Sequence, residues 1–98
     1  MTDATVHLLA RLIPKAGQGS ALKDAITAIV PQVLTEPGCI AYIAHESLDT
    51  PGVILMVEAW ADQAALDAHA IAPALRSLAA RFDALLAEPV HLERMRRL

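Results

Sequence analysis

The sequence is poor in several residue types, and each shortage excludes a class of protein. Its single cysteine, Cys39, cannot form an internal disulfide, which fits a reducing compartment, so we expect a cytoplasmic protein. The net charge is −3 and the basic residues cluster only near the end of the chain, at 94–97, so we expect no nucleic-acid partner. No two of the four histidines have the spacing of metal ligands, so we expect no metal site.

Long apolar runs are also missing. The longest uninterrupted run has six residues, 39–44, whereas a helix needs roughly 20 apolar residues to span a bilayer. The first residues show no basic stretch followed by an apolar one, which is the pattern of a signal peptide. We therefore expect neither a membrane partner nor a signal peptide.

The apolar content is nevertheless high, at 55% of residues against 19% charged. A chain of 98 residues is expected to form a single domain, 1–98, because domains usually run to roughly 100–150 residues. Such a small domain buries only about two thirds of its unfolded surface. Part of the apolar surface is therefore expected to be covered by another subunit.

The hydrophobic periodicity changes along the chain and predicts four strands and two helical regions. Apolar residues at helical spacing follow Ser20, which we expect to be the N-cap of a helix that Pro31 kinks or shortens. The second helical region is expected to begin at the cap Asp62 and to restart at Pro73. The predicted strands are 5–13, 39–47, 53–60 and 90–96, and the predicted helical regions are 20–35 and the stretch from 62 to the stop at Glu88-Pro89.

This order predicts an α+β ferredoxin-like fold, βαββαβ, with two helices on one face of a four-stranded antiparallel sheet. The turn at 49–52 joins the two central strands as a hairpin. Segments 39–44 and 53–57 are apolar on both faces, although every helix lies on one side. We therefore expect the second face to pack against a second copy, giving a homodimer through the sheet face.

The hairpin also groups candidate functional residues. Pairing Leu48 with Val53 across the turn would place His45, Glu58 and Trp60 on one sheet face and Tyr42 on the other, and a bulge would swap this partition. Glu58 is the only charge in an apolar strand, so its carboxyl must be hydrogen-bonded, paired or protonated. An ion pair with Arg11 is the structural explanation, and catalysis is the alternative. His69 follows Trp60 in the next helical region, and both are expected to face one cavity.

Several short motifs together resemble the antibiotic biosynthesis monooxygenase (ABM) domain family, especially its small quinol monooxygenase-type members. The resemblance implies a dimeric α+β barrel of ferredoxin-like subunits. Relatives often carry a second histidine just after the helix-breaking proline, and its absence here disfavours a mechanism that needs two helix histidines. Haem-degrading relatives place a haem-ligating histidine near 78–81, and its absence here disfavours haem degradation. The matching motifs are Ile29–Leu34, Glu36-Pro37-Gly38-Cys39, Tyr42-x-x-His45, Glu58-x-Trp60 and Leu66-Asp67-Ala68-His69.

The resemblance implies a cofactor-independent monooxygenase that oxidises a small phenolic or hydroquinone-type substrate with O₂, without flavin, haem or metal. The imidazole of His69 suits the role of a base, because the pKa of a free histidine side chain is about 6.5. The alternatives are an isomerase of a small keto or lactone metabolite and a non-catalytic small-molecule-binding domain. The expected catalytic residues are His69, Trp60 and Glu58, and the expected substrate-binding residues are Tyr42, His45 and Arg11.

Overall fold

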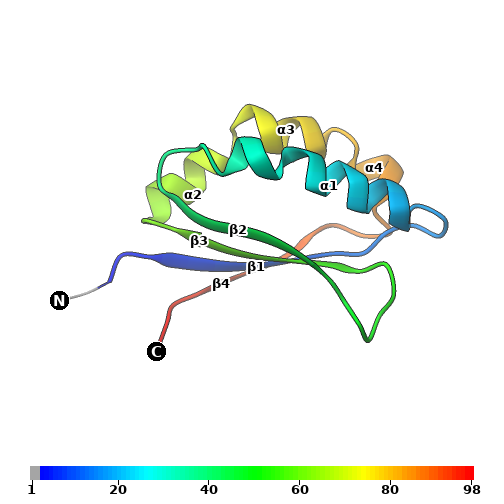
Figure 1. Cartoon of the computed structure of the whole chain (residues 1–98), viewed down its shortest axis with the longest axis horizontal. Helices are drawn as coiled ribbons and strands as arrows, with labels where there is room; N and C mark the ends of the chain where they lie inside the picture. The colour runs from blue at the N-terminus through cyan, green and yellow to red at the C-terminus, as the bar shows by residue number, and fades with distance from the viewer. Residues whose placement is uncertain (1–2) are drawn as a thin grey trace.

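The computed structural model describes residues 3–98 and contains four strands and four helices within them (Figure 1). The strands follow the predicted ones to within two residues at each end, and the second helical region is divided into three short helices. None of the helices in the described part of the chain is long and apolar enough to cross a membrane. The elements are β1 Val6–Leu12, α1 Gly19–Val33, β2 Cys39–Glu46, β3 Ile54–Trp60, α2 Gln63–Ala70, α3 Pro73–Ala79, α4 Phe82–Leu85 and β4 His91–Met95.

The strands form one antiparallel sheet in the order β2-β3-β1-β4, and the helices cover one of its faces (Figure 1). The predicted α+β ferredoxin-like fold is therefore confirmed. Helices α2 and α4 lie at opposite ends of the helical layer (Figure 1). Strand β4 forms an edge, and all five of its residues are exposed.

The predicted register of the hairpin is wrong by one residue. The Ser47 amide donates to the Val53 carbonyl at 2.9 Å, so Ser47, rather than Leu48, lies opposite Val53. The Ser47 hydroxyl accepts hydrogen bonds from the amides of Asp49 and Thr50, which draws Leu48 into the loop, where it is 98% exposed.

A shift of one residue moves every side chain of a strand to the other face. Tyr42 pairs with Glu58 and shares its face, under the helices, whereas His45 pairs with Leu55 on the open face. The expected grouping of His45 with Glu58, and the expected separation of Tyr42 from it, are therefore both wrong.

The helix boundaries correct one predicted cap and confirm another. Helix α1 begins at Gly19 after Gln18, and no side chain caps it, so the prediction of Ser20 as N-cap is wrong. The helix ends at Val33, within a turn of Pro31. At α2, the Asp62 carboxylate accepts a hydrogen bond from the Ala65 amide at 2.8 Å, as expected of an N-cap. Pro73 occupies the first turn of α3, as predicted.

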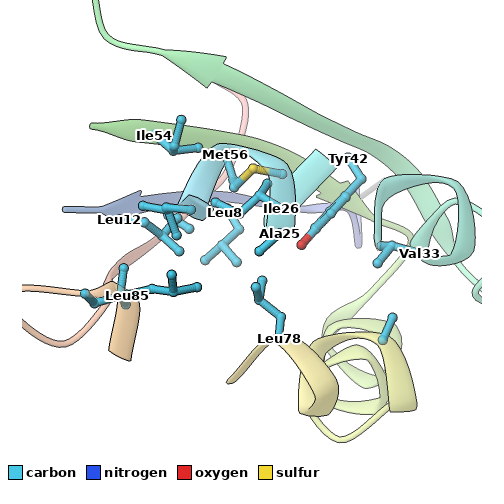
Figure 2. Close-up of a cluster of buried hydrophobic side chains, with 14 of the residues drawn as sticks. Leu8, Leu12, Ala25, Ile26, Val33, Tyr42, Ile54, Met56, Leu78 and Leu85 are labelled. Atoms are coloured by element: carbon cyan, nitrogen blue, oxygen red, sulfur yellow. The ribbon is translucent and has the colours of Figure 1, made fainter. Parts of the chain in front are cut away.

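The main core lies between the helices and the covered face of the sheet (Figure 2). Leu8, Met56 and Tyr42 from the sheet meet Ile26 of α1 and Leu78 of α3, and all five are buried. Figure 2 shows the Tyr42 ring extending from β2 into this layer, with its hydroxyl oxygen pointing away from the sheet.

Gly38 sets how closely α2 approaches the end of α1. Its φ is +80°, and a Cβ built on it would lie 2.5 Å from the Cβ of Ala65 in α2. The Gly38 carbonyl accepts a hydrogen bond from the Ala61 amide at 2.8 Å. The absence of a side chain at this position therefore lets α2 pack directly against the segment that carries Glu36.

The other face of the sheet is open in the single chain. Alternation along the paired strands places Leu9, Ile43 and Val57 in one row across it. The exposed fraction is 52% for Ile43 and 41% for Val57. This face thus combines an apolar centre with no covering helix.

Candidate active site

Three rings from three different elements meet at one end of the covered face. Trp60 ends β3, Tyr42 lies in β2, and His69 lies in α2. The indole of Trp60 stacks on the imidazole of His69, with ring centroids 4.5 Å apart and an interplanar angle of 28°. Tyr42 meets the imidazole edge-on at 5.4 Å. The imidazole is therefore held on two sides by aromatic rings.

Two carboxylates flank the same imidazole. Oε1 of Glu36 lies 2.8 Å from Nδ1 of His69, and Oε1 of Glu58 lies 4.0 Å from Nε2. The Nε1–H of Trp60 donates a hydrogen bond to Oε1 of Glu58 at 3.0 Å. His69 and Glu58 are buried, and the Glu36 side chain is 14% exposed. The sequence predicted neither partner of the Glu58 carboxyl.

The expected ion pair between Glu58 and Arg11 is wrong. Arg11 pairs with Leu55 and His91, which places its side chain on the open face, while Glu58 pairs with Leu8 on the covered face. The sheet itself separates the two side chains.

Burial shifts the proton affinities of the groups around His69. Burial raises the pKa of Glu58, and the hydrogen bond from Trp60 and the nearby His69 oppose the rise. Burial, reinforced by the charges of Glu58 and Glu36, raises the pKa of the Tyr42 hydroxyl. The tyrosine therefore keeps its proton and can donate it in a hydrogen bond at any physiological pH. Burial also raises the pKa of the Cys39 thiol, which favours its unreactive protonated form.

A cavity of about 210 Å³ lies between the helices and the covered face. Among the described residues that line it, the polar side chains are Tyr42, Glu58 and His69. The apolar lining comes from the sheet, from α1 and from the later helices: Leu8, Ala10, Leu12, Ile26, Met56, Leu66, Ala70, Leu75, Leu78, Ala79, Phe82, Val90 and Leu92. An apolar pocket with a few convergent polar groups is the usual form of a small-molecule site.

The structure brings together four of the six residues that the sequence singled out. His69, Glu58 and Tyr42 line the cavity, and Trp60 stacks behind His69 without lining it. The expectation that Trp60 faces the cavity together with His69 is therefore corrected: Trp60 supports the imidazole and donates a hydrogen bond to the Glu58 carboxyl. His45 and Arg11 lie on the open face of the sheet and do not line this cavity.

Glu36 belongs to the site, although the sequence did not assign it a role. The segment Glu36-Pro37-Gly38 is typical of the end of a helix, and Glu36 is 33 positions before His69 in the chain. The signal that could have found it is the presence of an acidic side chain in a motif of the family that the sequence resembles. Within residues 3–98, no three side chains of His, Cys, Asp or Glu converge in a way that could hold a metal ion.

Comparison with known proteins agrees with the fold and with the motifs. The family model for antibiotic biosynthesis monooxygenases matches residues 5–81. A Mycobacterium tuberculosis protein named "Putative monooxygenase Rv0793" is 32% identical over 85 residues, which cover 87% of this chain and 83% of the relative. Its solved structure superposes with a TM-score of 0.89 over 96% of this chain and 95% of that chain, at 30% identity.

Two other solved structures are similar over nearly their whole length. PA3566 from Pseudomonas aeruginosa has a TM-score of 0.92 and 26% identity, and the match covers 100% of this chain and 98% of that chain. SO0527 from Shewanella oneidensis has a TM-score of 0.88 and 28% identity, and the match covers 96% of this chain and 91% of that chain. The resemblance seen in the sequence is thus confirmed, and the chain belongs to the antibiotic biosynthesis monooxygenase family.

Proposed function

We propose that this protein is a cofactor-independent monooxygenase that oxidises a small phenolic or hydroquinone-type substrate with O₂. The observation that carries the proposal is the position of His69. One imidazole nitrogen contacts Glu36, and the other is directed toward Glu58 at the polar end of an apolar cavity. A base held in this way can remove a proton from a hydroxyl group that enters the cavity.

The first step is deprotonation of the substrate. With Nδ1–H donating to the Glu36 carboxylate, the lone pair of Nε2 is free to accept the phenolic proton. The carboxylate stabilises the imidazolium that results, because opposite charges in contact favour the charged form. The Tyr42 hydroxyl, kept protonated by its raised pKa, is a donor for the phenolate oxygen.

The second step uses the substrate as its own reductant. The electron-rich anion transfers one electron to O₂, and the two radicals combine to form an organic peroxide, whose distal oxygen takes the proton back from His69. Loss of water then leaves one oxygen atom on the ring. For a hydroquinone, the products are a hydroxyquinone and one water, and both hydrogens of that water come from the substrate. The apolar lining supports this chemistry because it limits the water that could quench the intermediates.

Oxygen uptake tests this proposal. The wild-type protein is incubated with a panel of hydroquinones and phenols while dissolved O₂ is recorded. His69→Ala is expected to lower kcat about 100-fold or more, the usual contribution of a general base. The matched control is His91→Ala, which removes an exposed histidine outside the cavity lining. Equal O₂ uptake by wild type and His69→Ala would contradict the proposal.

One observation also favours an isomerase. Glu58 and His69 are two titratable groups 4.0 Å apart in one cavity, an arrangement that could move a proton between two carbon atoms of a small keto or lactone metabolite. Such a reaction needs no O₂, so turnover under argon distinguishes it from oxygenation. A protein that binds ligand equally well after His69→Ala and turns over nothing would be a binding domain.

We also propose that the open sheet face packs against the same face of a second copy. Ile43 and Val57 are exposed there, and the row continues through Leu9. Two such faces can bury one another at the spacing of a β-sandwich. Light scattering is expected to give twice the chain mass, and Val57→Lys is expected to give the monomer, whereas Leu48→Lys in the exposed hairpin loop leaves the dimer intact. A monomeric wild type at micromolar concentration would rule this out.

A further inference from the structure

The polar and apolar parts of the cavity lie at different ends, and this polarity constrains the ligand. The three polar lining side chains belong to one end of the sheet: Tyr42 pairs with Glu58, and His69 of α2 lies 4.0 Å from Glu58. From this end the lining continues along β1 and β3 with apolar residues only. We infer that the substrate is an amphiphile, a hydroxylated aromatic ring with an alkyl side chain. This inference rests on the proposed function.

The register gives the length of the apolar part. Along β1, the lining residues are Leu8 beside Glu58, then Ala10 beside Met56, then Leu12. Four residues of strand span about 13 Å. At the far end, Phe82 of α4 and Val90 complete the lining (Figure 1 shows α2 and α4 at opposite ends of the helical layer).

The volume limits how much of that length a ligand fills. A cavity of about 150 Å³ lined by apolar side chains accommodates benzene. The cavity here, at about 210 Å³, therefore accommodates one ring and a short hydrocarbon chain. A charged or hydroxylated group inside the apolar part of the cavity would lose its hydration without gaining a partner, since the lining there is apolar.

The ring hydroxyl accordingly lies at the Tyr42 and His69 end, where donors and acceptors are available. The alkyl chain of the ligand extends toward Leu12, Phe82 and Val90. Phe82 and Val90 are only half-buried. A chain longer than the cavity therefore reaches solvent beside them, so further carbons add little to the affinity.

Calorimetric titration tests this directly. A series of 4-alkylcatechols, whose hydroxyls and alkyl chain lie on opposite sides of the ring, is titrated into the protein without O₂, so that only binding is measured. The series runs from unsubstituted catechol through methyl, propyl and pentyl to heptyl. The Kd is expected to fall about fourfold for each of the first methylenes and then to level off. A Kd that stays constant along the series, or rises with the first alkyl carbon, overturns the inference.

Two variants test where the alkyl chain of the ligand lies in the cavity. Val90→Phe fills the far end of the cavity, so the Kd is expected to stop falling at a shorter alkyl chain. Phe82→Ala enlarges that end, so the Kd is expected to stop falling at a longer alkyl chain. Leu48→Phe, in the exposed hairpin loop, is the matched control and is expected to leave the Kd values of the series unchanged. If one variant fails to fold, the other still tests the proposal, because each is expected to change the alkyl chain length at which the Kd stops falling. If the Kd depends on alkyl chain length in the same way in wild type and in a folded variant, the proposed position of the alkyl chain is contradicted.

The outcome is separable from that of the proposed function. If the series shows the expected chain-length dependence but no member supports O₂ uptake, the binding inference holds and the oxygenase proposal fails. If O₂ is consumed at rates and affinities that do not depend on chain length, the oxygenase proposal holds and this inference fails.

Discussion

Nδ1 of His69 lies 2.8 Å from Oε1 of Glu36, although the two residues are 33 positions apart in the chain. The contact joins the segment that follows α1 to the last turn of α2. It requires the close approach of α2 that Gly38 permits. A buried imidazole with one nitrogen engaged by a carboxylate has a defined tautomer and a defined orientation, which is what a base in a cavity needs.

The first prediction concerns that contact. Glu36→Gln keeps the shape of the side chain but removes the negative charge that stabilises the imidazolium. We expect kcat for O₂ uptake to fall about tenfold to 100-fold with little change in KM, because the substrate does not touch Glu36. Nitrogen chemical shifts of His69 are expected to report a changed tautomer population.

The matched control for Glu36→Gln is Glu46→Gln. Glu46 is about half exposed and forms an ion pair with Lys23, at 3.6 Å, on the surface. We expect its loss to change neither kcat nor the His69 spectrum. Equal kcat values for Glu36→Gln and wild type would show that Glu36 does not position the base.

The second prediction concerns the pH dependence of stability. Burial raises the pKa of Glu58 above its ordinary value of 4.5, so the folded state holds this proton more tightly than the unfolded state does. The contribution of Glu58 to the free energy of unfolding is therefore full below pH 4.5 and declines as pH rises through the folded-state pKa. Glu58→Gln is neutral at every pH and keeps an oxygen for the Trp60 hydrogen bond.

Denaturant titrations at several pH values measure this difference. We expect the unfolding free energy of Glu58→Gln, relative to wild type, to increase as pH rises above 4.5. Parallel pH profiles for the two proteins would mean that the pKa of Glu58 is not raised.

The third prediction separates the two roles of Trp60. Trp60→Phe keeps an aromatic ring against His69 but removes the Nε1–H that donates to Glu58. Because that hydrogen bond lowers the pKa of Glu58, its loss is expected to raise this pKa further. A carbon-detected NMR titration of the Glu58 carboxyl measures the change, and an unchanged or lower pKa would contradict the assignment of the hydrogen bond.

The fourth prediction concerns the hydroxyl of Tyr42. Tyr42→Phe keeps the ring contacts with His69 and Trp60 but removes the donor that faces the cavity. A hydrogen bond to a charged group contributes about 1.5 kcal/mol or more, so kcat/KM is expected to fall about tenfold. Unchanged kcat/KM in a variant with wild-type melting temperature would remove Tyr42 from the mechanism.

The fifth prediction compares two glycines with the same backbone conformation. Gly38 and Gly17 have φ values of +80° and +79°, but a Cβ at Gly38 would meet Ala65 at 2.5 Å, whereas a Cβ at Gly17 would meet nothing within 4 Å. Gly17→Ala is expected to cost about 1 kcal/mol for its left-handed backbone. Gly38→Ala is expected to cost about 2 kcal/mol or more, because α2 must also shift.

Denaturant unfolding of both variants gives this difference, and Gly38→Ala is also expected to lower kcat by displacing His69 from Glu36. Equal destabilisation by the two substitutions would show that the contact between Gly38 and α2 is loose.

Much of the architecture could be predicted from local chemistry. The strands follow from β-branched residues bounded by prolines and glycines, and Asp62 and Pro73 mark two helix starts correctly because a cap and a missing N–H act within one turn. The prediction of Ser20 as N-cap was wrong, since a hydroxyl suited to capping does not require the helix to begin there. The hairpin register failed for a similar reason: two hydrogen bonds from the loop to Ser47 extended the turn by one residue.

The candidate site was only partly predictable. Glu58, Trp60 and His69 stand out because a charge in an apolar strand and a histidine near a tryptophan are unusual, and the family resemblance reinforces them. Tyr42 was assigned to the wrong face by the register error, and His45 and Arg11 to the wrong neighbourhood. Glu36 was missed because nothing local in a helix-ending segment indicates which distant side chain it will contact.

The sequence by itself determined the order of elements and the excess of apolar surface, because these depend on composition and on periodicities of two to four residues. It also indicated the family, because the motifs that carry the resemblance are each contained in a short segment of the chain. Only the tertiary structure decided which side chains share the cavity with His69. That depends on a one-residue register between strands and on the close packing of α2 against Gly38, which are set by hydrogen bonds and contacts between residues far apart in the chain.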